Sequence, residues 1–151
     1  MGLEFVQPEP LADCRKNATI DDNRLCVDRL RNAGINCTGL FIVEPQATWS
    51  TFNRLDQWID EAGLRTATLS IFSPFPGTPA WERDAGRLTT RDSRRWDLCH
   101  LVLPSPNLPR WLFYIRFAWS HLRLLGRNPA LRRHVWLNLV HPTSIRRSPR
   151  S

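Results

Sequence analysis

The chain has 151 residues, and its 21 Lys and Arg outnumber its 14 Asp and Glu to give a formal net charge of +7. This length suits one domain and excludes a complete barrel of eight strand–helix units, which takes about 250 residues. The composition, 42% hydrophobic, is that of an ordinary globular protein, and no run approaches the roughly 20 apolar residues of a membrane span.

The first predicted element is a strand at residues 3–6, and a short helix is predicted at residues 10–16. Glu4 places an acid where a secretory signal peptide carries Lys or Arg, so we expect a cytoplasmic protein. The next helix is predicted at residues 21–33, and Thr19 is a suitable N-cap for it because its hydroxyl can accept a hydrogen bond from the first turn.

A repeat with an offset of 29 residues organises the first half of the chain. In each copy a helix ends at a glycine, Gly34 or Gly63, and an apolar run rich in β-branched and aromatic residues follows. These runs, at residues 35–43 and 66–72, alternate with helices, which is typical of parallel strands joined by helices. The helix before Gly63 carries an apolar stripe at helical spacing. The stripe consists of Phe52, Leu55, Ile59 and Ala62.

This pattern fits a piece of a doubly wound sheet or a piece of a barrel. In both architectures ligands bind at the carboxyl ends of the strands. These ends are at residues 4–7, 44–46 and 73–79. The last is a rigid loop with three prolines, and it also has a purely structural interpretation, because Thr78 and Pro79 are typical first residues of a helix.

Six short motifs occur together between residues 2 and 100. They are Gly2-Leu3-Glu4, Gly34-Ile35, Gly39-Leu40-Phe41-Ile42-Val43, Ala62-Gly63-Leu64, Pro74-Phe75-Pro76-Gly77-Thr78-Pro79 and Trp96-Asp97. In this order and spacing they resemble the second half of the catalytic domain of cobalamin-dependent radical S-adenosylmethionine (SAM) proteins. The sequence of residues 41–55 is similar to the hopanoid C-3 methylase branch of that family.

The resemblance implies an α/β fold, a partial (half) TIM-like barrel of parallel strand–helix units, with SAM lying across the carboxyl ends of the strands. It also implies a [4Fe-4S] cluster and cobalamin as cofactors. Glu4 would face the nucleoside or the substrate, and the backbone around Ile42 would approach the adenine. The cofactor-binding residues that the resemblance implies are Glu4, Gly39, Ile42, Glu44, Ser73 and Phe75.

The cysteines depart from this family. The four cysteines stand 12, 11 and 62 residues apart, so the CxxxCxxC loop that holds the cluster is absent. This spacing favours reduced, structural cysteines, and no metal site is predicted. We therefore expect this chain to be a portion of a methyltransferase that acts on an apolar or lipid substrate. Alone it would be inactive, and its partner would be an N-terminal half that carries the cluster loop. The alternative is a non-enzymatic fragment whose basic helix binds a membrane surface or a protein. The cysteines are Cys14, Cys26, Cys37 and Cys99.

Residues 111–125 predict a helix with 11 apolar positions that ends near Gly126. One interpretation packs this helix on the partial barrel, with its arginines reaching water. The other places residues 110–127 in a membrane interface at the inner face, where the arginines meet anionic lipid. Nucleic-acid binding is not expected, because the aromatic residues gather in one apolar helix instead of alternating along a basic face.

The charge divides the chain. Residues 1–86 hold 12 acids and 8 bases, whereas residues 87–151 hold 2 acids and 13 bases. Such an asymmetry is typical of a chain with an interaction segment. We therefore predict strand–helix units at residues 1–86, a helical extension at residues 87–127 and a flexible basic tail at residues 128–151.

Overall fold

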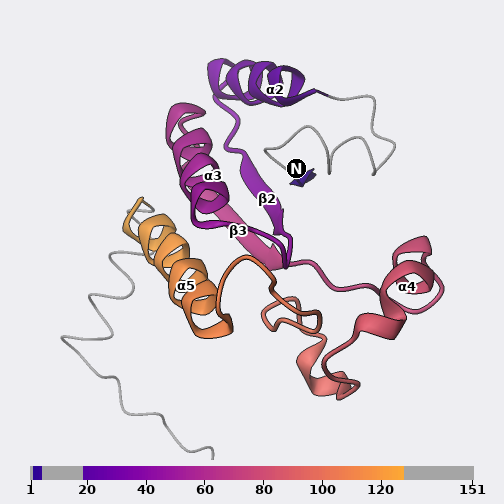
Figure 1. The fold of residues 1–151 in the computed structure, drawn as a ribbon. Helices are drawn as coiled ribbons and strands as arrows, with labels where there is room; N and C mark the ends of the chain where they lie inside the picture. The colour runs from indigo at the N-terminus through magenta and orange to yellow at the C-terminus, as the bar shows by residue number, and fades with distance from the viewer. Residues whose placement is uncertain (1, 5–18, 128–151) are drawn as a thin grey trace, which may run out of the picture.

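The computed structural model describes residues 2–4 and 19–127, so the helix predicted at residues 10–16 and the tail predicted at residues 128–151 lie outside the described residues. Three strands alternate with helices, two single 3-10 turns follow, and a long helix comes last (Figure 1). The elements are β1 (Gly2–Glu4), α2 (Ile20–Asn32), β2 (Thr38–Val43), α3 (Trp49–Glu61), β3 (Thr66–Ile71), α4 (Pro79–Asp84), the 3-10 turns Ala85–Arg87 and Ser93–Arg95, and α5 (Arg110–Arg127).

The strands form one parallel sheet in the order β1-β2-β3, which confirms the predicted parallel α/β arrangement. Between β2 and β3 the paired residues differ by 28 positions, so that Phe41 lies opposite Leu69. The sequence repeat of 29 instead aligns Leu40 with Leu69. Because side chains alternate across a sheet, this difference of one residue reverses the face: Leu40 is exposed and Leu69 is buried. The repeat therefore predicted the elements correctly, and the strand alignment differs from the repeat by one residue.

The helix ends follow the predicted signals. Thr19 caps α2 and forms a complete capping box with Asp22. Gly34 and Gly63 follow α2 and α3 with φ of 74° and 64°, the left-handed region that favours glycine. At each glycine two backbone bonds close the last turn, as in a Schellman motif. These bonds run from Gly34 to Arg31, Ile35 to Leu30, Gly63 to Asp60 and Leu64 to Ile59.

Helices α3 and α5 cover one face of the sheet and pack against each other (Figure 1). The core lies between them and the strands, and every residue of the predicted α3 stripe is part of it. Leu101, Phe113 and Phe117 belong to the same core as Phe41 and Ile71. The helical extension and the strand–helix units therefore share one core across residue 86.

The opposite face of β2 and β3, the open face, has no buried side chain. Its residues face each other in register, and the hydroxyls of Thr38 and Thr66 lie 2.8 Å apart. Parallel sheets normally carry helices on both faces. In the part of the chain that the structure describes, this sheet is covered on one face only. The open face consists of Thr38, Leu40, Ile42, Thr66, Thr68 and Ser70.

Helix α5 is held on α3 by a buried arginine. Arg116, with only 4% of its surface exposed, donates to the carboxylate of Asp56 and to the amide oxygen of Asn53, both at 2.8 Å. Its other terminal nitrogen donates to Ser120 at 3.1 Å. Helix α5 thus packs on β3 and α3 as the packed interpretation expects, but Arg116 is buried in this contact instead of reaching water. Among the described helices none has the length and hydropathy needed to cross a bilayer.

Candidate functional site

The carboxyl ends of β2 and β3 form one rim of the sheet. After β2 the chain turns at Glu44, whose carbonyl accepts the N–H of Ala47 at 3.0 Å and whose carboxylate accepts the amide of Gln46 at 2.7 Å. Asn107, which precedes α5, donates to the carbonyl of Gln46. This turn is therefore tied to a segment about sixty residues further along the chain, which fixes the position of Glu44.

A polar cavity of about 140 Å³ lies beside Glu44. Its wall contains Asp84, which is buried and accepts hydrogen bonds from Arg83 at 2.9 Å and from Arg87 at 3.0 Å. Pockets for small organic ligands usually measure about 300–1,000 Å³. The cavity suits a few waters or a small polar group, so it is one wall of a nucleoside site at most. Its lining residues are Glu44, Pro45, Gln46, Phe72, Arg83, Asp84, Arg87, Leu103 and Pro104.

The loop after β3 presents an aromatic cluster at the same rim. Ser73 is buried and its hydroxyl turns back to the carbonyl of Ile71 at 3.5 Å. Phe75 is exposed and meets the ring of Trp96 edge-on at 6.0 Å, and Trp96 meets Trp81 at 5.6 Å. The loop ends where the hydroxyl of Thr78 caps α4, with Pro79 in its first turn, which confirms the predicted start of this helix.

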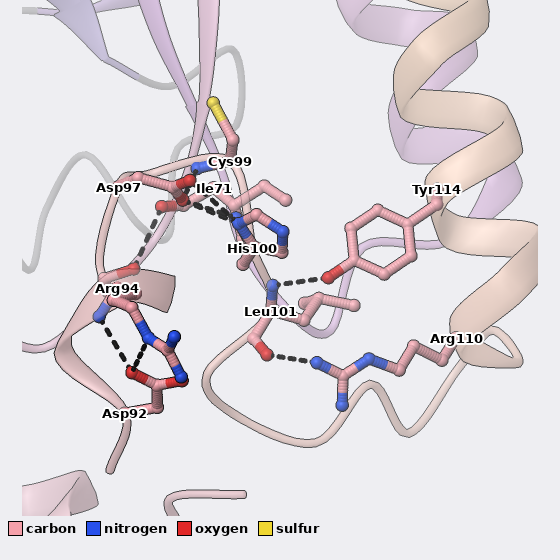
Figure 2. Close-up of polar contacts among 10 residues, drawn as sticks. Ile71, Asp92, Arg94, Asp97, Cys99, His100, Leu101, Arg110 and Tyr114 are labelled. Atoms are coloured by element: carbon pink, nitrogen blue, oxygen red, sulfur yellow. Dashed lines mark hydrogen bonds and ion pairs between the residues drawn. The ribbon is translucent and has the colours of Figure 1, made fainter. Parts of the chain in front are cut away.

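The segment between Trp96 and α5 is hydrogen-bonded to the end of β3 (Figure 2). The N–H of Ile71 donates to the carbonyl of Leu98 at 2.6 Å, and the N–H of Leu101 donates to the hydroxyl of Tyr114 on α5 at 2.8 Å. The carboxylate of Asp97 lies 2.9 Å from Nδ1 of His100 and accepts the N–H of Cys99. These bonds, that to His100 first, hold the pKa of Asp97 below its usual value.

Cys99, His100 and Asp97 have the residue types of a nucleophilic triad, but their geometry does not make one. The sulfur of Cys99 points away from the imidazole of His100 (Figure 2), while the imidazole nitrogen and two backbone N–H groups converge on Asp97. A nucleophile must lie within hydrogen-bond reach of its base. The arrangement is therefore a turn stabilised by Asp97.

Another cavity, of about 610 Å³, lies at the amino ends of the strands. It is lined by the loops after Gly34 and Gly63 and by Arg31. The guanidinium of Arg31 donates to Asp28 and to the carbonyl of Ala62, so it serves the helix ends. In parallel α/β folds this end of the sheet serves stability, and ligands bind at the other. Size alone does not make this cavity the site.

The structure brings four of the six predicted site residues to the carboxyl half of the sheet. Ile42 is on the open face near the end of β2, and Glu44, Ser73 and Phe75 are at the rim. Glu4 ends β1, and its backbone lies level with Phe41. Gly39 lies at the other end of β2, where an added Cβ would stand 2.7 Å from the ring of Phe41 and 2.9 Å from Leu64. Packing alone accounts for this glycine. The cofactor-binding role of all six stays a prediction.

Two groups at the rim were missed from the sequence. Arg83 on α4 and Arg87 on the 3-10 turn that follows it flank the cavity because both lie beside Asp84. The i, i+3 spacing of Asp84 and Arg87 was the available signal. The rings of Trp81 and Trp96 are in contact because the chain turns back between them, which no local sequence pattern indicates.

The described residues do not fit an iron–sulfur cluster. No three Cys, His, Asp or Glu among residues 2–4 and 19–127 lie close enough together to hold a metal ion. Cys26 and Cys99 are exposed on separate elements, and Cys37 is half-buried at the amino end of β2. A [4Fe-4S] cluster takes thiolates gathered around one point. We therefore assign no chemical step of that cluster to this chain.

The fold and the rim define a small parallel α/β protein with a polar and aromatic surface at the carboxyl ends of its strands. The chain is 32% identical over 114 residues to the hopanoid C-3 methylase of Methylococcus capsulatus, which covers 76% of this chain and 22% of that protein. It is 25% identical over 154 residues to the bacteriochlorophyllide d C-8(2)-methyltransferase of Chlorobaculum tepidum, which covers 95% of this chain and 34% of that protein. The chain thus spans between a fifth and about a third of the length of these relatives. No family profile matches it, and no solved structure matches it significantly.

Proposed function

We propose that this chain supplies the second-half strand–helix units of a cobalamin-dependent radical SAM methyltransferase. In this role its rim forms one wall of the SAM and substrate site, and another polypeptide region brings the cluster loop. The observation that carries the proposal is the open face. The carboxyl ends of these parallel strands present polar and aromatic groups, and no element among residues 2–4 and 19–127 covers their second face. Both relatives are named for methyl transfer, which supports the same class of reaction.

The order of the strands and helices favours a partial barrel rather than a doubly wound sheet. The strand order is sequential, and α3 and α5, which follow β2 and β3, pack together on one face. In a doubly wound sheet the chain crosses to the other face of the sheet after the last strand of the first half, so helices lie on both faces. In a barrel every helix stays outside and the inner face is closed by further strands. We therefore propose that the open face is the inner face of a partial barrel.

The rim supports binding of an apolar molecule next to a polar one. Glu44 and the cavity beside it offer a carboxylate and two guanidinium groups that can meet hydroxyls or a carboxylate. Phe75 offers exposed aromatic surface from the neighbouring loop, and the half-buried ring of Trp96 lies against it. We propose that the substrate is an apolar or lipid molecule that contacts these rings, with SAM nearer Glu44 and Ile42.

A chimera tests the proposal. The matching segment of the Methylococcus hopanoid C-3 methylase is replaced by this chain, the cluster is reconstituted without oxygen, and SAM binding and cleavage are measured. We expect the chimera to bind and cleave SAM, and the methylase lacking the segment to do neither. A chimera that folds and holds its cluster but binds no SAM would refute the proposal.

A matched pair of carboxylates tests the rim itself. In the chimera we expect Glu44→Gln to raise the Kd for SAM about tenfold, the usual cost of a charge-assisted hydrogen bond. Glu82→Gln changes an exposed carboxylate on α4 and should leave the Kd unchanged. Equal effects of the two substitutions would remove Glu44 from the site.

A further inference from the structure

The outer surface of α5 carries a continuous apolar stripe that no part of the described chain covers. Its members recur every three or four residues, which places them on one side of a helix. They are among the most exposed large apolar side chains of the protein. This outer stripe consists of Trp111 (64% exposed), Ile115 (55%), Trp119 (55%), Leu122 (60%) and Leu125 (39%).

The stripe is not a by-product of the core. The buried side of α5 holds Phe113, Phe117 and Leu124, together with Arg116, and at about 100° per residue these positions lie opposite the outer stripe. The helix is thus apolar on two opposite sides. A helix on the outside of an α/β domain normally presents a polar outer face. Contiguous exposed apolar surface of this kind marks an interaction site.

The charges beside the stripe are positive. On one flank Arg123 and Arg127 both pair with Asp60 of α3, and Arg123 also lies 3.9 Å from Asp56, which already pairs with Arg116. On the other flank Arg110 donates to the carbonyl of Leu101, a group without formal charge. In the sequence no Asp or Glu follows Asp97, while nine arginines do. The surface complements an apolar layer with negative charge at its edge.

We infer that α5 lies in the surface of an anionic membrane, with the outer stripe in the lipid and the flanking arginines at the headgroups. Trp111 and Trp119 suit this position because tryptophan rings settle at the boundary between hydrocarbon and water. The arginines add attraction to anionic lipid that salt weakens. The inference stands on α5 alone and does not require the proposed methyltransferase role.

Vesicle flotation of the full chain tests this inference. The probes are vesicles of phosphatidylcholine alone and of phosphatidylcholine with about one third phosphatidylglycerol, at low salt and at about 0.5 M salt. We expect the protein to float with the anionic vesicles at low salt, and at least fivefold less with the neutral vesicles or at high salt. A protein that stays unbound from anionic vesicles at low salt overturns the inference.

Two double variants locate the contact. Trp119→Ser with Leu122→Ser removes apolar surface from the stripe and should lower vesicle binding more than tenfold. Leu25→Ser with Ile35→Ser removes two side chains of similar exposure elsewhere and should leave binding unchanged. Circular dichroism confirms that both variants are folded. Equal binding by the two variants overturns the inference, and so does stripe-dependent self-association in size-exclusion chromatography without vesicle binding.

Discussion

Removal of Arg116 tests whether a buried ion pair fixes α5 to α3. In Arg116→Met the carboxylate of Asp56 stays buried and loses its bond at 2.8 Å, while Arg123 remains nearby at 3.9 Å. Loss of one partner of a buried pair costs about 3–5 kcal/mol. Because Arg123 offsets part of this, we expect a loss of about 3 kcal/mol in the free energy of unfolding, a large share of the 5–15 kcal/mol of a typical domain.

Urea unfolding followed by circular dichroism measures this loss, and two further variants interpret it. Arg116→Met with Asp56→Leu removes both charges and should recover all but about 1 kcal/mol, since apolar replacements of a buried pair are often neutral. Arg24→Met removes an ion pair with Glu61 whose partners are both exposed, and should cost less than about 1 kcal/mol. The reasoning is refuted if Arg116→Met costs no more than Arg24→Met, or if the double variant is as unstable as the single one.

Three further predictions concern the sheet, the helix ends and the pH. Gly39→Ala should cost about 1–3 kcal/mol in urea unfolding because its Cβ would press on Phe41 and Leu64; a neutral result would show that packing does not explain this glycine. Gly34→Ala and Gly63→Ala should each cost about 1 kcal/mol in urea unfolding because each glycine has a left-handed backbone, and a neutral result at both positions would contradict this reasoning. At Gly63 the added Cβ would also displace the guanidinium of Arg31, which donates to the carbonyl of Ala62. Hydrogen bonds lower the pKa of four carboxylates, Asp97, Asp92, Asp22 and Glu61. Their stabilising contribution is therefore complete above about pH 5 and is lost as the pH falls below about 4. Thermal melts should show a melting temperature that falls with the pH in this range, and Asp97→Asn should make that fall less steep.

The sequence predicted those features that depend on neighbouring residues. The caps at Thr19 and Thr78 and the ends at Gly34 and Gly63 are local events, since each needs only a hydroxyl or a backbone without a Cβ at one position. The stripe on α3 is also local because it depends only on helical spacing. These signals sufficed for the order of strands and helices and for the parallel sheet.

Features that depend on distant residues were beyond the sequence. The paired strand residues are 28 positions apart and the repeat is 29, because the loop after Gly34 is longer by one residue than the loop after Gly63. A repeat in the sequence does not show this difference in loop length. Likewise, Trp81 meets Trp96, and Asn107 meets Gln46, only after the chain has folded back. The rim is built mostly from such contacts. The sequence therefore predicted which strand ends form the rim, but not the residues that surround them.

Two surfaces that no described part of the chain covers point in opposite directions. Helices α3 and α5 lie on one face of the sheet (Figure 1), and the open face is the other. The outer stripe is on the side of α5 opposite the residues that α5 buries in the core. A partner that completes the barrel would cover Leu40 and Ile42 and leave Trp119 exposed. A membrane that receives α5 would leave the rim free. The chimera and the flotation experiment therefore test independent surfaces, and an apolar substrate drawn from the lipid layer would require both.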